Sequence, residues 1–128
     1  METINSDSRR LGRWGEEQAA KYLRLRGYSV LEMNYSCRLG EIDIIARRGR
    51  YIVFAEVKLR KDAAFAEAKE FVTAAKQRRI VATAQMYLST KGIELQPRFD
   101  VLEVYAPKGM DGRAKIIHTE NAFGVDEF

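Results

Sequence analysis

Residues 40–58 alternate between apolar and charged positions in a way that predicts two strands and a short turn. The first run reads Gly-Glu-Ile-Asp-Ile-Ile-Ala, the second reads Tyr-Ile-Val-Phe-Ala-Glu-Val-Lys, and the stretch 47–50 between them is basic. Strand alternation places Ile42 and Ile44 on one face of the first strand and Asp43 on the other, with Ile45. We therefore expect a β-hairpin at the centre of the fold.

Two acidic residues of this hairpin are predicted to share a face. With a turn centred on residues 48–49, Asp43 would lie opposite Phe54 and diagonal to Glu56, at roughly 7–8 Å between Cα atoms. Two carboxylates at that spacing repel each other and could share one divalent cation. Lys58 follows Glu56 on the same face, so the alternative is an ordinary salt bridge at the end of a strand.

Helical spacing of apolar residues predicts a helix before the hairpin, from a cap among residues 6–8 to about Arg26, where Gly27 stops it. The cap candidates are Ser6, Asp7 and Ser8, and the apolar stripe contains Leu11, Gly15, Ala19, Tyr22 and Leu23. Glu16 lies on the flank of this stripe and is the acidic residue of the helix best placed to reach inward. The alternative is a surface glutamate near the positive end of the helix.

The remaining chain adds strands at 28–35, 99–105 and 115–119, and a second helix from the cap Thr73 to about Ser89. The inward positions expected on that helix are Val72, Ala75, Ile80, Ala84, Tyr87 and Leu88. Residues 61–71 are expected to form a partly mobile or helical connection, and Phe123 should dock the tail. This order predicts an α/β fold, a mixed sheet with helices on its faces and a crossover between the third and fourth strands.

Lys76, Arg78 and Arg79 fall in the first two turns of the second helix, where positive charge opposes the helix dipole. Such residues indicate either a solvated basic face or an anionic ligand. Asp100 shares a strand face with apolar residues, and we expect it to pair with Arg98 or with a helix. A surface or core position is the expectation for His118, rather than a catalytic one.

Composition sets wider limits on the class of protein. The 128 residues fit a single domain, with 46% hydrophobic and 31% charged residues and a net charge of +4. That charge permits an acidic partner such as nucleic acid. The chain contains no apolar run near the ~20 residues of a membrane span, and its first ten residues lack the apolar centre of a secretion signal. One cysteine, Cys37, excludes an intrachain disulfide, so we expect a cytoplasmic location without a membrane partner.

The hairpin sequences, together with several outlying pairs, resemble the bacterial YraN family. The outlying matches are Gly15-Glu16, Tyr22-Leu23, Gly27-Tyr28, Lys76-Gln77, Tyr87-Leu88, Arg98-Phe99-Asp100-Val101 and Asn121-Ala122-Phe123. The resemblance covers nearly the whole chain. That family is similar in fold to the PD-(D/E)XK nucleases, particularly archaeal Holliday-junction resolvases. The resemblance therefore implies a single domain with a restriction-endonuclease-like αβββαβ core, frayed over about seven N-terminal and four C-terminal residues.

The resemblance also implies a chemistry, metal-dependent hydrolysis of DNA phosphodiester bonds, on branched or repair and recombination intermediates. Asp43 and Glu56 would bind Mg²⁺ or Mn²⁺ with the Val57 carbonyl, and Glu16 would bind the metal directly or through water. Lys58 would orient or help deprotonate the attacking water. Gln77 would orient Lys58 or the scissile phosphate. The residues expected to contact backbone phosphates are Arg60, Lys76, Arg78 and Arg79.

Two positions depart from the pattern of the relatives. Leu59 replaces a small hydroxyl residue beside Lys58, and Phe65-Ala66 lacks a glycine often found there. A second Glu-x-Lys sequence, residues 67–69, falls where no strand is expected. The alternative function is a module that binds nucleic acid or a protein partner with little or no catalysis, and a structural adaptor is a third. The protein would act as a monomer or as a homodimer.

Overall fold

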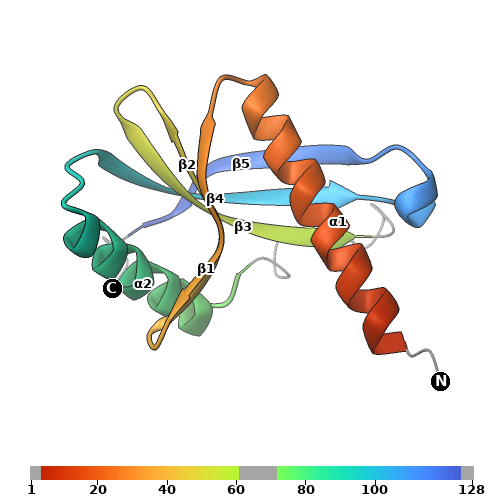
Figure 1. The fold of residues 1–128 in the computed structure, drawn as a ribbon, viewed down its shortest axis with the longest axis horizontal. Coiled ribbons are helices and arrows are strands. Elements are labelled where there is room, and N and C mark those ends of the chain that lie inside the picture. The colour runs from red at the N-terminus through yellow and green to blue at the C-terminus, as the bar shows by residue number, and fades with distance from the viewer. Residues whose placement is uncertain (1–3, 61–71, 125–128) are drawn as a thin grey trace.

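A computed structural model describes residues 4–60 and 72–124 and shows a mixed α/β architecture (Figure 1). Three strands follow the first helix and two follow the second, as the sequence pattern predicted, and a short 3-10 turn precedes the last strand. The elements in chain order are α1 (Ile4–Leu25), β1 (Ser29–Cys37), β2 (Gly40–Arg48), β3 (Tyr51–Arg60), α2 (Ala74–Lys91), β4 (Gln96–Tyr105), η3 (Gly109–Asp111) and β5 (Lys115–Phe123). Neither helix in these ranges is both long and apolar enough to cross a membrane.

The five strands form one sheet in the order β1-β2-β3-β4-β5. Neighbouring strands are antiparallel except β3 and β4, which run parallel. Helix α2 makes the crossover between those two strands, because parallel neighbours cannot be joined by a tight turn. This arrangement is consistent with the restriction-endonuclease-like core expected from the sequence.

The sheet separates two apolar cores, each covered by one helix. Side chains of β2, β3, β4 and β5 pack with α2 around Phe54 and Tyr87 on one face. On the other face, β2, β3 and β4 pack with α1 around Leu23 and Leu102. The central strands β3 and β4 are apolar on both faces because both of their faces are covered.

The predicted helix ends are largely confirmed. Gly27 follows α1 with φ of 89°, and the main-chain N–H of Tyr28 donates to the carbonyl of Leu23 at 3.0 Å. Thr73 caps α2 by accepting a hydrogen bond from Lys76 N, and Gly92 ends it in the left-handed region. The predicted cap of α1 is wrong, because the helix begins at Ile4 and residues 6–8 lie inside it.

The predicted hairpin register is also wrong by two residues. Ile45 lies opposite Phe54, and Arg48 lies opposite Tyr51, so the turn is formed by Gly49-Arg50. This register moves Asp43 along β3, towards Glu56. The turn at 49–50 is favoured because Gly49 adopts φ of 59°, which a side chain would oppose.

Two further predictions, about which side chains point into the cores, are wrong. Ile42 and Ile44 do not share a face: Ile42 packs in the α2 core with Ile45, and Ile44 packs in the α1 core. Strict alternation fails between them because β2 leaves β3 at this point. On α2, the predicted inward residue Ala75 is exposed, since it belongs to the first turn, beyond the edge of the sheet.

Candidate active site

The candidate site lies in a fork where the β1–β2 hairpin separates from β3. β2 pairs with β3 from Arg48 back to Ile44, whereas its pairing with β1 continues to Gly40. In the fork, Asp43 Oδ2 accepts a hydrogen bond from the main-chain N–H of Val57 at 2.8 Å. The side chain thus takes the place of a strand carbonyl and satisfies β3 where β2 has departed.

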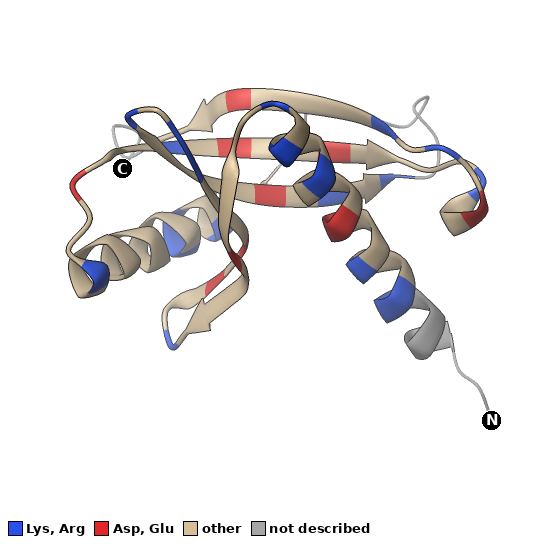
Figure 2. Cartoon of the chain, turned by 45° about the horizontal axis from the view of Figure 1, so that its top comes forward, with Lys and Arg blue, Asp and Glu red and all other residues tan. Residues whose placement is uncertain are grey.

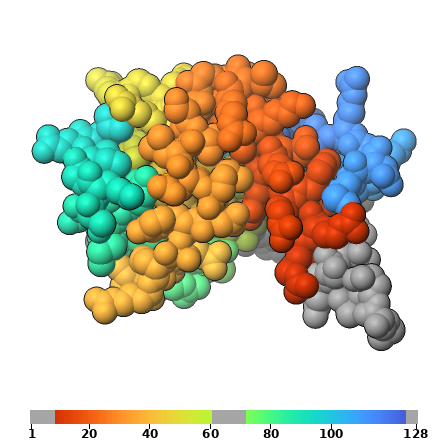
Figure 3. Space-filling model, viewed as in Figure 1, coloured from red at the N-terminus to blue at the C-terminus, as the bar shows by residue number. Residues whose placement is uncertain are grey.

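Helix α2 closes one side of this fork. A Cβ on Gly40 would lie 3.0 Å from Thr83 Oγ1 and 3.4 Å from Arg79 Cβ, so only glycine lets the hairpin approach the helix this closely. In the space-filling view the tip of the hairpin lies beside the first turns of α2 (Figure 3). Together, Gly40, Glu41, Asp43, Glu56, Lys76, Arg79 and Ile80 line a pocket of about 330 Å³.

Glu56 lies on the face of β3 that α2 covers, and only 4% of its side chain is exposed. Lys76 Nζ, from the first turn of α2, lies 2.5 Å from Glu56 Oε2, whereas Lys58 Nζ lies 3.9 Å from the same oxygen. Burial alone would lower the pKa of Lys76, but the hydrogen bond and charge of Glu56 outweigh it and raise that pKa. The carboxylate therefore has an internal cation as its partner.

The pKa of the Asp43 carboxyl is strongly raised in the fork. Burial, followed by the nearby charge of Glu56, raises its pKa from 3.8 to about 7, against the opposing effect of the Val57 N–H. The charge of Glu16, on α1, adds to this rise. Glu16 is thus near enough for its field to act on the fork, although it is only half-buried.

The donor atoms in the fork fit a hard divalent cation. Mg²⁺ commonly takes one or two protein carboxylates and keeps several waters, which Asp43 and Glu56 can provide. Across residues 4–60 and 72–124, no three carboxylate, histidine or cysteine side chains gather closely enough to enclose a metal ion. The structure therefore brings together Asp43 and Glu56 with Lys58 and Lys76, and it leaves Glu16 outside that group.

The other predicted site residues lie at different distances from the fork. Gln77 Nε2 donates to the carbonyl of Val72 at 2.9 Å, so its amide ties down the start of α2. Arg60 Nε lies 3.1 Å from Oε2 of the buried Glu103, which makes it part of the sheet rather than an open phosphate contact. Arg78 and Arg79 are exposed on α2, and of the two only Arg79 lines the pocket.

Leu59, where the resemblance led us to expect a small hydroxyl residue, packs in the α1 core close to Gly15. It points to the sheet face opposite Lys58, since adjacent strand residues alternate. The features expected at 61–71, including Phe65-Ala66 and the second Glu-x-Lys sequence, lie outside the described residues.

Sequence reasoning missed the close pairing of Lys76 with Glu56, having assigned this lysine to phosphate contacts. A signal was available: a lysine in the first turn of a helix opposes its dipole, and a buried strand carboxylate needs a partner. Figure 2 shows this pattern, with acidic positions within the central strands and basic positions on the facing helices.

The expected partner of Asp100 is confirmed. This carboxylate is fully buried and accepts two hydrogen bonds from Arg98, from Nε at 3.0 Å and Nη2 at 2.8 Å. His118 Nε2 lies 2.6 Å from Asp100 Oδ2, and the main-chain N–H of Asn121 donates to Oδ1 at 3.0 Å. His118 is therefore a structural residue here, as expected.

Comparisons with known proteins identify the family of the chain. Residues 15–104 match the family described as "Uncharacterised protein family UPF0102". A relative from Syntrophotalea carbinolica, named "UPF0102 protein", is 44% identical over 91% of this chain and 93% of its own length. Relatives from Symbiobacterium thermophilum and Caldanaerobacter subterraneus are 46% and 41% identical over 91% and 96% of this chain. They are covered over 98% and 100% of their own lengths. The chain therefore belongs to the UPF0102, or YraN, family.

Proposed function

We propose that the protein is a metal-dependent nuclease that hydrolyses DNA phosphodiester bonds, with branched or repair and recombination intermediates as its substrates. The observation that carries this proposal is the fork itself. Asp43 and Glu56 face each other there, the pKa of Asp43 is raised to about 7, and two lysines adjoin them. A protein that only binds DNA has no need of paired carboxylates facing a phosphate backbone.

Asp43 and Glu56 would hold Mg²⁺ or Mn²⁺, with the Val57 carbonyl as a third ligand and Glu16 acting directly or through water. The metal would supply charge relief on the phosphoryl oxygens and lower the pKa of an attacking water. Lys58, whose side chain is 30% exposed, can hold and orient that water and offset negative charge. Gln77 would act indirectly, by fixing the first turn of α2 that carries Lys76.

Lys76 would have two partners in this proposal. Without a metal its ammonium neutralises Glu56, as the 2.5 Å distance indicates. When another cation holds Glu56, the ammonium is available to a phosphate oxygen at the mouth of the same pocket. Arg78 and Arg79 on the outer turns of α2 would add backbone contacts without reading sequence. Arg60 would contribute to stability, through Glu103.

The test is cleavage of single-stranded, duplex, flapped and four-way-junction DNA in EDTA, Mg²⁺ or Mn²⁺. We expect metal-dependent cutting that Glu56→Ala and Lys58→Ala each reduce at least about a hundredfold. Glu17→Gln is the matched control, because Glu17 is an exposed acid next to Glu16 and should leave the rate unchanged. Calorimetry should show Mn²⁺ affinity falling at least about tenfold in Asp43→Asn and in Glu56→Gln.

The alternative is a binding module with this fold and little or no catalysis. The Lys76–Glu56 ion pair favours it, because it neutralises Glu56 without any metal. DNA binding with no cutting in any metal, and unchanged Mn²⁺ affinity in both carboxylate variants, would reject the nuclease and support the module. Cutting that persists in Glu56→Ala would instead place the active site elsewhere.

A further inference from the structure

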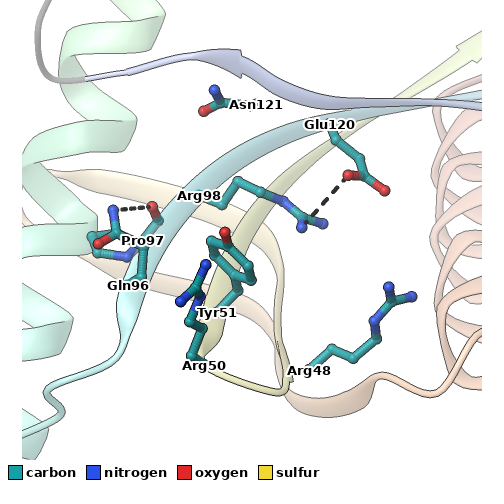
Figure 4. A pocket seen from close by; sticks show the side chains of 8 residues that line it. All are labelled: Arg48, Arg50, Tyr51, Gln96, Pro97, Arg98, Glu120 and Asn121. Carbon is teal, nitrogen blue, oxygen red and sulfur yellow. Dashed lines mark hydrogen bonds and ion pairs between the residues drawn. The ribbon is translucent and has the colours of Figure 1, made fainter.

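A second, larger hollow lies at the other end of β3, where β2 ends and β4 begins (Figure 4). Its volume is about 800 Å³, within the range of sites that bind nucleotide-sized ligands. We call it the arginine hollow. Its lining residues are Arg48, Arg50, Tyr51, Gln96, Pro97, Arg98, Glu120 and Asn121.

The floor of the arginine hollow is rigid. Arg98 is held by two hydrogen bonds to the buried Asp100, and its Nη2 also donates to Tyr28 Oη at 2.5 Å. Glu120 at the rim lies 3.6 Å from Arg98 Nη1, so the two carboxylates nearest the hollow both compensate Arg98. The ring of Tyr51 lies 5.3 Å from the Arg98 guanidinium, which fixes the wall beside it.

The other two arginines carry charge without a carboxylate partner in the described parts of the chain. Arg48 Nη1 donates to the main-chain carbonyl of Arg26 at 3.1 Å, and Arg50 stacks at 5.4 Å from the centre of the Tyr51 ring. Both side chains are exposed, and Arg48 ends β2 while Arg50 belongs to the turn of the β2–β3 hairpin. The hollow therefore presents two fixed positive charges to solvent.

We infer that the arginine hollow binds a phosphate group, carried by a nucleic-acid strand or by a free nucleotide. Guanidinium groups match the oxygens of phosphate with paired N–H donors, and two of them balance the dianion of a terminal or free phosphate and exceed the single charge of a phosphodiester. The hollow is large enough for the sugar and base attached to that phosphate. The amides of Gln96 and Asn121 can donate and accept hydrogen bonds with those parts.

This phosphate site is separate from the proposed active site. Tyr51 and Glu56 are five positions apart along β3, or about 17 Å at strand spacing. The arginine hollow also shares no lining residue with the pocket around the two carboxylates. A phosphate bound here is therefore not the one being cleaved, and its binding can be measured in EDTA, where the proposed nuclease would be inactive.

The experiment measures binding of a short fluorescein-labelled single strand by anisotropy across a salt series, with AMP and inorganic phosphate as competitors. Arg48→Gln with Arg50→Gln should weaken strand binding about tenfold and reduce the salt slope by about 0.7, the contribution of one single-strand phosphate contact. Arg9→Gln with Arg113→Gln removes the same charge from exposed positions elsewhere. This control should change the slope little.

Arg50→Gln alone guards against a folding defect, because the Arg48 side chain also bonds the end of α1, whereas the Arg50 side chain has an aromatic ring as its contact among the described residues. It should give about half of the change in slope. Competition by AMP or phosphate at low concentration, lost in the double variant, would identify a free phosphorylated ligand as the occupant. If neither AMP nor phosphate competes, and the double variant still binds the strand more weakly, the occupant is the nucleic-acid strand. The inference would be overturned if the control pair weakened strand binding equally. It would also be overturned if Arg50→Gln changed neither strand binding nor competition by AMP or phosphate.

Discussion

Two interactions of the Asp43 carboxylate have opposite effects on its pKa. Its carboxylate accepts the main-chain N–H of Val57 where β2 leaves β3, and it also faces the carboxylate of Glu56 in a partly buried fork. The first interaction favours the ionised form and the second favours the neutral one. Because the pKa rises to about 7, repulsion and burial outweigh the hydrogen bond.

This pKa predicts a pH dependence of stability with a defined sign. The folded pKa of Asp43 lies above its ordinary value of 3.8, so ionisation costs stability progressively as pH rises from about 4 to about 7. In EDTA, the free energy of unfolding of Asp43→Asn should therefore rise relative to that of the wild type by on the order of 2 kcal/mol between about pH 4 and pH 8.

Urea unfolding at several pH values measures this difference. Asn keeps an oxygen that can accept the Val57 N–H, so the substitution removes mainly the charge. Asp111→Asn, at an exposed acid of η3, is the control, and its plot of unfolding free energy against pH should be parallel to that of the wild type. Parallel profiles for Asp43→Asn as well would show that Asp43 ionises normally.

At this scale the sequence indicated that Asp43 and Glu56 lie close together, but not which other side chains adjoin them. Period-two alternation puts Asp43 and Glu56 near each other in either register, because a shift of two residues preserves the face. The partner Lys76 comes from another element, twenty residues later. Its position depends on how deeply α2 packs against the hairpin, which no local pattern encodes.

The close packing of α2 on the β1–β2 hairpin fixes the shape of the fork. Gly40 makes this possible in two ways, through its φ of 152° and through the absence of a Cβ near Thr83 and Arg79. The helix itself was predictable, since Thr73 and Gly92 mark its ends and its buried residues recur at helical spacing. The register of the hairpin was not, because both candidate turns contain Gly49.

Gly40→Ala should destabilise the protein by about 2–3 kcal/mol, since strain at positive φ adds to a contact that is too short. Gly49→Ala is the matched control: its φ of 59° is also positive, but nothing lies within 4 Å of the added carbon. It should cost only about 1 kcal/mol. Thermal or urea unfolding of both variants gives the difference, and equal losses would mean that α2 does not pack tightly against the hairpin.

Across the whole molecule, the pKa values of Asp43 and Asp100 are shifted in opposite directions, so their ionisation has opposite effects on stability. Burial alone would raise the pKa of Asp100, but bonds from His118, Arg98 and the N–H of Asn121 hold it below its ordinary value. Asp100 therefore contributes stability that is present above about pH 4 and lost as pH falls through its lowered pKa. With Asp43 opposing it at higher pH, we expect the metal-free protein to be most stable in mildly acidic solution.

The Asp100 cluster also joins three segments that lie far apart in the sequence. It ties β4 to His118 and Asn121 of β5 and, through Arg98, to Tyr28 before β1. Asp100→Asn should cost about 3–5 kcal/mol near neutral pH, since it leaves the Arg98 charge without its buried partner. It should also flatten the loss of stability at acid pH.

Glu120→Gln removes the exposed partner of the same arginine and should cost at most about 1 kcal/mol. Urea unfolding from about pH 2 to pH 8 measures both variants. Equal, small losses would mean that the stability of this end of the sheet comes from its apolar cores, with the charged cluster only accommodated between them.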